Sequence, residues 1–106
     1  MPTAFFVSSD IQAVGTLGAI SAVGLRCPED ISIAGFDDIE PASHLGLTTM
    51  RQQMYEMVMW AAESLLARLE DPSQKPTQTL FVPKLVIRNT SRARVSQEYM
   101  ASETAE

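Results

Sequence analysis

Two adjacent carboxylates follow a short apolar segment in the first half of the sequence. The segment begins at Ile31, reads Ile-Ser-Ile-Ala-Gly-Phe, and leads directly to Asp37 and Asp38. β-Branched Ile31 and Ile33 favour a buried strand, and Gly35 lets the backbone change direction before the acidic pair. Carboxylates accept hydrogen bonds from a ligand's hydroxyl or amino groups, or coordinate a cation. Because ligands of open α/β sheets bind at the carboxyl ends of strands, this pair is the first candidate for a binding site.

A second polar group follows a second apolar run. Residues 4–7 read Ala-Phe-Phe-Val, too short a run for a helix, and Ser-Ser-Asp comes next. We predict a strand over 4–7 and a helix from Asp10, acting as the N-cap, to about Val23, with Gly24 closing it. Strand, helix and strand then form one right-handed βαβ unit. Two glycines inside the helix, Gly15 and Gly18, suggest that another element approaches closely there.

The second half of the sequence predicts a long helix between two strands. Asp38 is expected to cap the turn that follows it, and 39–45, which includes Pro41, is expected to be irregular. The last strand should break at Pro83, which has no N–H for a ladder. The remaining segments, in chain order, are predicted as a brief strand at 47–50, a polar crossing at 51–53, a helix at 54–69, a turn at 73–79, a strand at 80–88 and a disordered tail from about residue 91.

Composition excludes several classes of function. The chain has 106 residues with a net charge of −5, and its eight basic residues are scattered, which argues against nucleic-acid binding by this segment itself. One cysteine, Cys27, allows no internal disulfide and fits a reducing cytosol. No run is long and apolar enough to span a membrane. The opening residues lack the basic region of a signal peptide, so we expect the chain to begin inside a larger protein.

Catalytic and metal-binding interpretations find little support. Ser8 or Ser9 with His44 and Asp37 could supply a nucleophile, a base and an orienting group, but no nucleophile-elbow pattern surrounds either serine. Asp10 and the acidic pair could hold Mg²⁺, yet the expected partner lysine is not identifiable. His44 has no second ligand at metal spacing. We therefore predict no enzyme activity, no metal and no cofactor.

Four sequence blocks in this order closely resemble the C-terminal part of LacI/GalR-family transcriptional regulators. The blocks are Pro-Thr-Ala-Phe-Phe-Val-Ser-Ser-Asp at 2–10, Gly-Leu-Arg-Cys-Pro-Glu-Asp-Ile-Ser-Ile-Ala-Gly-Phe-Asp-Asp at 24–38, Leu-Thr-Thr-Met-Arg-Gln at 47–52 and Leu-Val-Ile-Arg-Asn-Thr-Ser at 85–91. The resemblance extends over nearly the whole chain up to Ser91.

The resemblance implies an α/β fold made of partial Rossmann-like, periplasmic-binding-protein-like lobes with a parallel sheet. It assigns 1–48 to the C-terminal lobe, 49–82 to the crossing and the long helix of the N-terminal lobe, 83–91 to the returning strand and 92–106 to a disordered tail. It also implies a cytoplasmic regulator that binds a small, sugar-like effector, works as a homodimer without a membrane partner, and contacts operator DNA only through an N-terminal helix-turn-helix absent from this chain.

Site residues follow from the resemblance position by position. Asp37 falls on the family's effector-contacting aspartate, and Gln52 falls at the inter-lobe crossing, where a side chain can reach ligand. Ser9 stands where many members have asparagine, and serine is shorter and lacks the second arm of an amide contact. Phe6, at the end of the first strand, is a weaker candidate for stacking on a flat ligand.

The resemblance also indicates surfaces for self-association. Family dimers use the first helix of this segment, which places Val14 near an interface. In the long helix, the family often has a small or polar pair where this chain has Val58 and Met59. We expect Met59, Trp60 and Leu66 to be partly exposed and to drive association.

One competing interpretation shares the same lobes. A sugar-binding protein of a periplasmic ABC transporter has a similar cleft between lobes. The sequence upstream of this chain distinguishes the two, because a helix-turn-helix indicates a regulator and a signal peptide indicates a transporter component.

Overall fold

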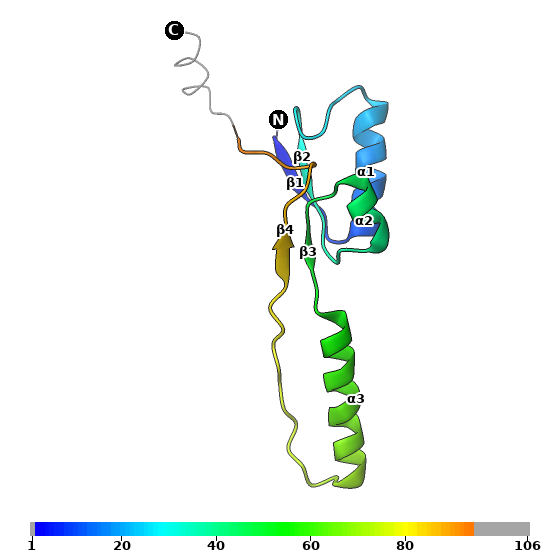
Figure 1. Cartoon of the computed structure of the whole chain (residues 1–106), viewed down its shortest axis with the longest axis vertical. Coiled ribbons are helices and arrows are strands. Elements are labelled where there is room, and N and C mark those ends of the chain that lie inside the picture. The colour runs from blue at the N-terminus through cyan, green and yellow to red at the C-terminus, as the bar shows by residue number, and fades with distance from the viewer. Residues whose placement is uncertain (1, 95–106) are drawn as a thin grey trace.

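The computed structural model of the chain describes residues 2–94, which form an α/β body and a long arm joined by two strands (Figure 1). The described chain is elongated, with extents of 70 × 29 × 22 Å. The body contains β1 (Ala4–Phe6), α1 (Asp10–Ala22), β2 (Ser32–Ala34) and α2 (Glu40–Leu45). The joining strands are β3 (Thr49–Arg51) and β4 (Lys84–Val86), and the arm consists of α3 (Met54–Glu70) and the segment that returns from it.

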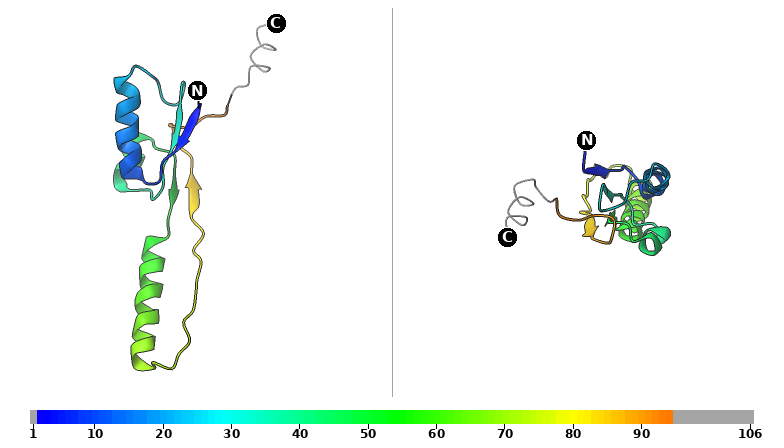
Figure 2. Two further views of the ribbon diagram at one scale, coloured as in Figure 1. Left: turned by 180° about the vertical axis from the view of Figure 1, so that it is seen from behind. Right: turned by 90° about the horizontal axis from the view of Figure 1, so that it is seen from above.

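The predicted βαβ unit is present. β1 and β2 pair in parallel, with Phe5 opposite Ile33, and a parallel bridge from Ala34 to Thr48 extends the sheet toward β3. Both helices of the body lie on the same side of these strands (Figure 2). The core between helices and strands is formed by Ala13, Ile20, Ile31, Ile33, Ala42 and Leu47, and this burial stabilises the body at roughly 25 cal/mol per Å² of apolar surface.

The start of α1 differs from the prediction by one residue. The N-cap is Ser9, whose backbone is extended and whose side-chain Oγ accepts from the Gln12 N–H at 3.3 Å. Asp10 is the first helical residue instead, and it is fully buried. Serine and aspartate are both good caps, so the local pattern could not separate them. At the other end, Gly24 closes the helix with a φ of 80°, as predicted.

The two helical glycines have no close neighbour within the described chain. A Cβ built on Gly15 or Gly18 would meet no atom within 4 Å. The expected close approach of another element is therefore wrong for residues 2–94. These glycines instead leave one stretch of the α1 surface narrow and open.

A short helix occupies a segment that was expected to be irregular. α2 begins after Ile39, has Pro41 in its first turn and ends at Gly46, whose φ of 67° is left-handed. Proline is compatible with the first turn because the N–H that it lacks would have no helical acceptor there. Pro41 thus marks a helix start rather than a break.

The two joining strands are antiparallel. Arg51 pairs with Lys84 and Thr49 with Val86. β4 starts directly after Pro83, which confirms the predicted break and leaves the ordered strand much shorter than residues 80–88.

The long helix α3 has no buried residue within the described chain. Its main aromatic contact is an edge-to-face pair of Trp60 with Phe81 of the returning segment, with centroids 6.4 Å apart and an interplanar angle of 70°. Met59 is 42% exposed and Leu66 60% exposed, in line with the expected exposure. Within residues 2–94, therefore, α3 is not enclosed in a core.

The end of the described chain returns to the body. Residues 92–94 form neither helix nor strand, but the Arg92 N–H donates to Ser32 Oγ at 3.3 Å and its guanidinium donates to the Glu29 carbonyl. The predicted disorder of 95–106 concerns residues outside those described. No helix of the described chain is long and apolar enough to cross a membrane.

Candidate functional site

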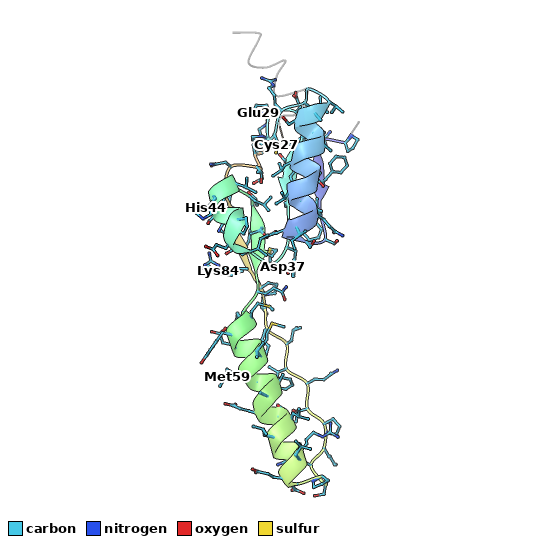
Figure 3. The ribbon with its side chains drawn as sticks, turned by 90° about the vertical axis from the view of Figure 1, so that its right-hand side faces the viewer. Cys27, Glu29, Asp37, His44, Met59 and Lys84 are labelled. Carbon is cyan, nitrogen blue, oxygen red and sulfur yellow. The ribbon has the colours of Figure 1, made fainter. Side chains whose placement is uncertain are left out.

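Asp37 and Gln52, the two leading candidates from the sequence, contact each other. The Gln52 amide Nε2 donates to Asp37 Oδ1 at 2.6 Å, and the Asp37 N–H donates to the Met50 carbonyl at 2.9 Å. Both side chains are half-buried. Figure 3 places Asp37 at the end of the body where the joining strands lead to α3. The pair leaves Asp37 Oδ2 and Gln52 Oε1 as acceptors that can receive hydroxyl or amino groups of a ligand.

Asp38 serves a different purpose from Asp37. Its carboxylate accepts from Arg51 Nε at 2.7 Å and pairs with Arg88 NH2 at 2.8 Å, and its side chain is only 9% exposed. Burial raises the pKa of the Asp38 carboxyl, but the hydrogen bonds and charges of both arginines outweigh it, so the net pKa is lowered. The expected capping role is wrong, because α2 is preceded by Ile39 without any side-chain cap.

Asp10 organises the loop that carries the acidic pair. Its Oδ1 accepts from Thr49 Oγ1 at 2.7 Å and its Oδ2 accepts from the Ile39 N–H at 3.0 Å. Its own N–H donates to the Phe36 carbonyl at 3.0 Å. A Cβ on Gly35 would lie 2.2 Å from Asp10 Oδ1, so only glycine fits beside this carboxylate. Asp10 therefore holds the loop on both sides of Asp37.

The backbone φ angles of the acidic pair are positive, a region that residues other than glycine rarely adopt. Asp37 has a φ of 126° and Asp38 a φ of 61°. Such conformations cost on the order of 1–3 kcal/mol each and persist only where surrounding contacts fix them. Here the Asp10 contacts on one side and the arginines on the other provide that support. Strain of this kind is concentrated at ligand sites.

The weaker candidates lie at the neighbouring strand end. Because β1 and β2 are parallel, Phe6, which ends β1, and Ser9, which comes after it, lie at the same edge as Asp37. Phe6 is 68% exposed, and the Ser9 oxygen is the α1 cap, which leaves its hydroxyl hydrogen available as a donor. The structure thus gathers the four candidates at one edge and places only Asp37 and Gln52 in hydrogen-bond contact.

The remaining titratable groups lie apart from this edge. His44 is exposed on α2, and the described residues hold no group of three or more His, Cys, Asp or Glu arranged to bind a metal. Cys27 is half-buried with Sγ 3.4 Å from the Thr90 carbonyl, and burial raises the pKa of its thiol. Figure 3 shows Cys27 and His44 on the body and Met59 on the arm.

Sequence reasoning missed the residues that support the site. Asp10, Arg51 and Arg88 each follow or end a strand, which is the one local signal that they carry. The hydrogen-bond and ion-pair partners of these residues lie far away in the sequence, so no spacing pattern predicts the contacts. Gly35, two positions before Asp37, was recognised as a turn residue but not as the neighbour of a buried carboxylate.

Comparison with known proteins places the chain in a family. Residues 1–91 match the periplasmic binding protein-like domain. The chain is 42% identical over 91 residues to the ribose operon repressor of Haemophilus influenzae, covering 84% of this chain and 27% of that protein. It is 39% identical over 94 residues to the arabinose metabolism transcriptional repressor of Geobacillus stearothermophilus, covering 86% and 26%. The chain therefore spans about a quarter of the length of these relatives.

Solved structures give the same result. A LacI family transcriptional regulator from Enterococcus faecium with bound ribose superposes with a TM-score of 0.76 at 27% identity, over 84% of this chain and 34% of that chain. The lac repressor dimer bound to operator and the anti-inducer ONPF superposes with a TM-score of 0.72 at 33% identity, over 87% and 32%. The predicted α/β fold with a parallel sheet is confirmed. The chain belongs to the family of periplasmic-binding-protein-like domains, and its homologues are LacI-family transcriptional repressors.

Proposed function

We propose that this chain is the C-terminal part of the effector-binding domain of a LacI-type repressor, and that Asp37 and Gln52 bind the effector. The observation that carries the proposal is the 2.6 Å contact between these side chains at the carboxyl edge of the strands, where the chain crosses toward α3. In α/β sheets this edge is where ligands bind.

The proposed division of the chain follows the crossing. Residues 1–48 form part of the C-terminal lobe, 49–82 contain the crossing and the long helix of the N-terminal lobe, and 83–91 return to the C-terminal lobe. The antiparallel pairing of β3 with β4 supports this division, because the chain leaves and re-enters the body through adjacent strands. The rest of both lobes and the DNA-reading helix-turn-helix would lie upstream.

The proposed effector is a small molecule rich in hydroxyl groups, such as a sugar. Asp37 Oδ2 and Gln52 Oε1 are both acceptors, and two neighbouring hydroxyls of a sugar ring would donate to them. The structural relatives with bound ribose, sucrose and cellobiose support this class of ligand. A charge-assisted hydrogen bond to Asp37 would contribute about 1.5–3 kcal/mol to binding. Ser9 would donate its hydroxyl, and Phe6 would cover one ring face.

The proposed mechanism is linkage between two sites. Effector held between the lobes biases their closure, and the DNA-reading heads of a homodimer respond by a change in spacing. Coupling of this kind is typically worth 1–3 kcal/mol. Val14 on α1, which is 39% exposed, is proposed for the dimer contact, and Met59 and Trp60 for association through α3. As for other such repressors, the cytoplasm is the proposed location. The homologues are repressors rather than transport proteins, which favours this function over a periplasmic sugar-binding protein.

The test uses the intact protein that contains this chain. D-Ribose, sucrose and cellobiose are titrated calorimetrically, and operator DNA is selected from a random library. Asp37→Ala should abolish the effect of the active sugar on operator affinity while leaving sugar-free operator binding unchanged. Asp30→Ala, which removes a half-buried carboxylate that pairs with Arg26 away from this edge, is the matched control and should respond normally. A wild-type response in Asp37→Ala would refute the site, and failure of the intact protein to bind DNA would refute the repressor function.

A further inference from the structure

Both joining strands send an arginine to one carboxylate. Arg51 is the last residue of β3, and Arg88 follows β4 closely. Their guanidinium nitrogens lie 2.7 Å and 2.8 Å from the two oxygens of Asp38. Arg88 additionally donates from NH1 to the Leu47 carbonyl at 2.9 Å. Asp38 therefore joins the outgoing strand, the incoming strand and the loop after β2 at one point.

This ion-pair cluster lies next to the candidate ligand contact along both segments of chain. Asp37 accepts a hydrogen bond from Gln52. Asp38, which follows Asp37, accepts one from Arg51, which precedes Gln52. The Asp37 N–H also donates to the Met50 carbonyl, and Asp37 and Arg51 form a parallel bridge. Adjacent Cα atoms are only about 3.8 Å apart, so a displacement of Arg51 displaces Gln52 with it.

The burial of the cluster makes its contacts strong. The Asp38 side chain is 9% exposed and that of Arg88 16% exposed, whereas that of Arg51 is 53% exposed. Charge-assisted hydrogen bonds are stronger than neutral ones, and a largely buried pair is little screened by salt. Removing Asp38 would leave Arg88 without its anion and release Arg51 into solvent. Both strands would then lose their charged contact with the loop after β2 at the point where they leave the body.

We propose that Asp38 is a positioning residue: by holding Arg51 and Arg88 together, it fixes the direction of the joining strands and thereby the placement of Gln52 against Asp37. The consequence for ligand response rests on the proposed function. The structural consequence is that the arm is held in one orientation relative to the body, and this consequence does not depend on the proposed function.

The structural part is tested by NMR on the 106-residue chain. Residual dipolar couplings of α1 and α3 in the wild type should fit one alignment frame, and in Asp38→Asn they should need two. Exchange of the Gln52 side-chain amide protons should accelerate about tenfold or more in Asp38→Asn, the factor expected for loss of a charge-assisted contact. Asp30→Asn, which likewise removes a carboxylate charge paired with an arginine, but away from the joining strands, should match the wild type. A single frame and unchanged Gln52 exchange in Asp38→Asn would overturn the proposal.

Variants of Arg51 keep the test decisive if Asp38→Asn does not fold. Arg51 is half exposed, so its substitution should spare the body. Arg51→Gln should accelerate Gln52 exchange, and Arg51→Lys, which keeps the charge, should restore most of the protection. Equal exchange in both variants would contradict a role for the ion pair.

The ligand consequence is tested in the intact protein with D-ribose, sucrose and cellobiose as probes. Asp38→Asn should bind the active sugar more weakly than the wild type. The factor by which the sugar changes operator affinity should also be smaller than in the wild type, by about fivefold or more. A normal change in Asp38→Asn would refute Asp38 while leaving the proposed function intact. If the wild type binds none of the sugars, the proposed effector class fails, and the NMR results still decide the role of Asp38.

Discussion

The Thr49 hydroxyl donates a 2.7 Å hydrogen bond to the buried carboxylate of Asp10, although the two residues are 39 positions apart in the sequence. The contact ties the start of α1 to the start of β3, and it lies directly beneath the loop that presents Asp37. Both side chains are completely buried, so solvent water does not reach either one to replace a lost hydrogen bond between them. This pair links the stability of the body to the geometry of its candidate site.

Loss of Asp10 should therefore be costly. Asp10→Ala leaves the Thr49 hydroxyl and the Ile39 N–H without an acceptor, at about 1–3 kcal/mol for each group, so the free energy of unfolding should fall by roughly 3 kcal/mol. Thr49→Val removes one contact and should cost about half as much. Urea unfolding followed by circular dichroism measures both. A loss under about 0.5 kcal/mol for Asp10→Ala, the range of ordinary surface changes, would contradict this account.

Alanine at two glycines should have opposite effects. At Gly35 the new Cβ would meet Asp10 Oδ1 at 2.2 Å and Leu47 Cδ2 at 3.3 Å, so the loop or the buried carboxylate must shift, at about 1–3 kcal/mol. At Gly18 the Cβ meets nothing, and removal of a helical glycine should stabilise α1 by up to about 1 kcal/mol. Thermal unfolding of the two variants compares them directly. Stabilisation by Gly35→Ala would show that the carboxylate does not lie against the loop.

The Asp38 carboxyl should make stability depend on pH. Its pKa is lowered in the folded chain because the arginines outweigh burial, so its contribution is complete above the unfolded value of about 3.9. That contribution is lost as the pH falls from there through the folded pKa. The difference in unfolding free energy between the wild type and Asp38→Asn should thus be constant near neutral pH and shrink below about pH 4. A difference that stays constant down to pH 2 would exclude the ion pair as its source.

The exposed side chains of α3 should drive self-association of the chain. Met59→Ser removes an apolar side chain that is 42% exposed and should lower the average mass measured by analytical ultracentrifugation. Trp60→Ser should do the same, although it also removes the edge contact with Phe81. Glu63→Ser, an exposed polar change on the same helix, is the control. A wild type that is a monomer at all concentrations, or variants of unchanged mass, would contradict association through this surface.

The thiol of Cys27 should react slowly with alkylating reagents. Burial raises its pKa, and a higher pKa leaves less of the reactive thiolate at pH 8. Iodoacetamide labelling followed by mass spectrometry should be slower for the folded chain than for the chain in urea. Equal rates would show that the side chain is open to solvent.

Local patterns predicted the elements well, and long-range contacts escaped them. Apolar runs with β-branched residues located β1 and β2, and the helical spacing located α1 and α3, because these signals lie within each segment. α2 was missed because Pro41 is compatible with both a break and a helix start, and only the buried Ala42 decides for the helix.

Local sequence patterns predicted only part of the candidate site. A carboxylate after a strand pointed to Asp37, but nothing local connects Asp38 with Arg88 or Asp10 with Thr49. Those pairs form because the parallel sheet and the antiparallel crossing bring distant strand ends to one edge. Asp10 was assigned as a cap because its buried partners are invisible in the sequence.

Because β3 and β4 are antiparallel neighbours, the arm is an insertion between two adjacent strands of the fold. Arg51 lies opposite Lys84, and the Gln53 side chain reaches the Val82 carbonyl at 3.1 Å, so the two ends of the excursion over residues 54–81 are neighbouring strands. Adjacent strands are about 4.8 Å apart, a gap that a two-residue hairpin turn closes. A chain shortened in this way would keep every residue of the α/β body and both arginines of Asp38. Evolution could therefore lengthen, replace or lose this arm by changes at a single hairpin position.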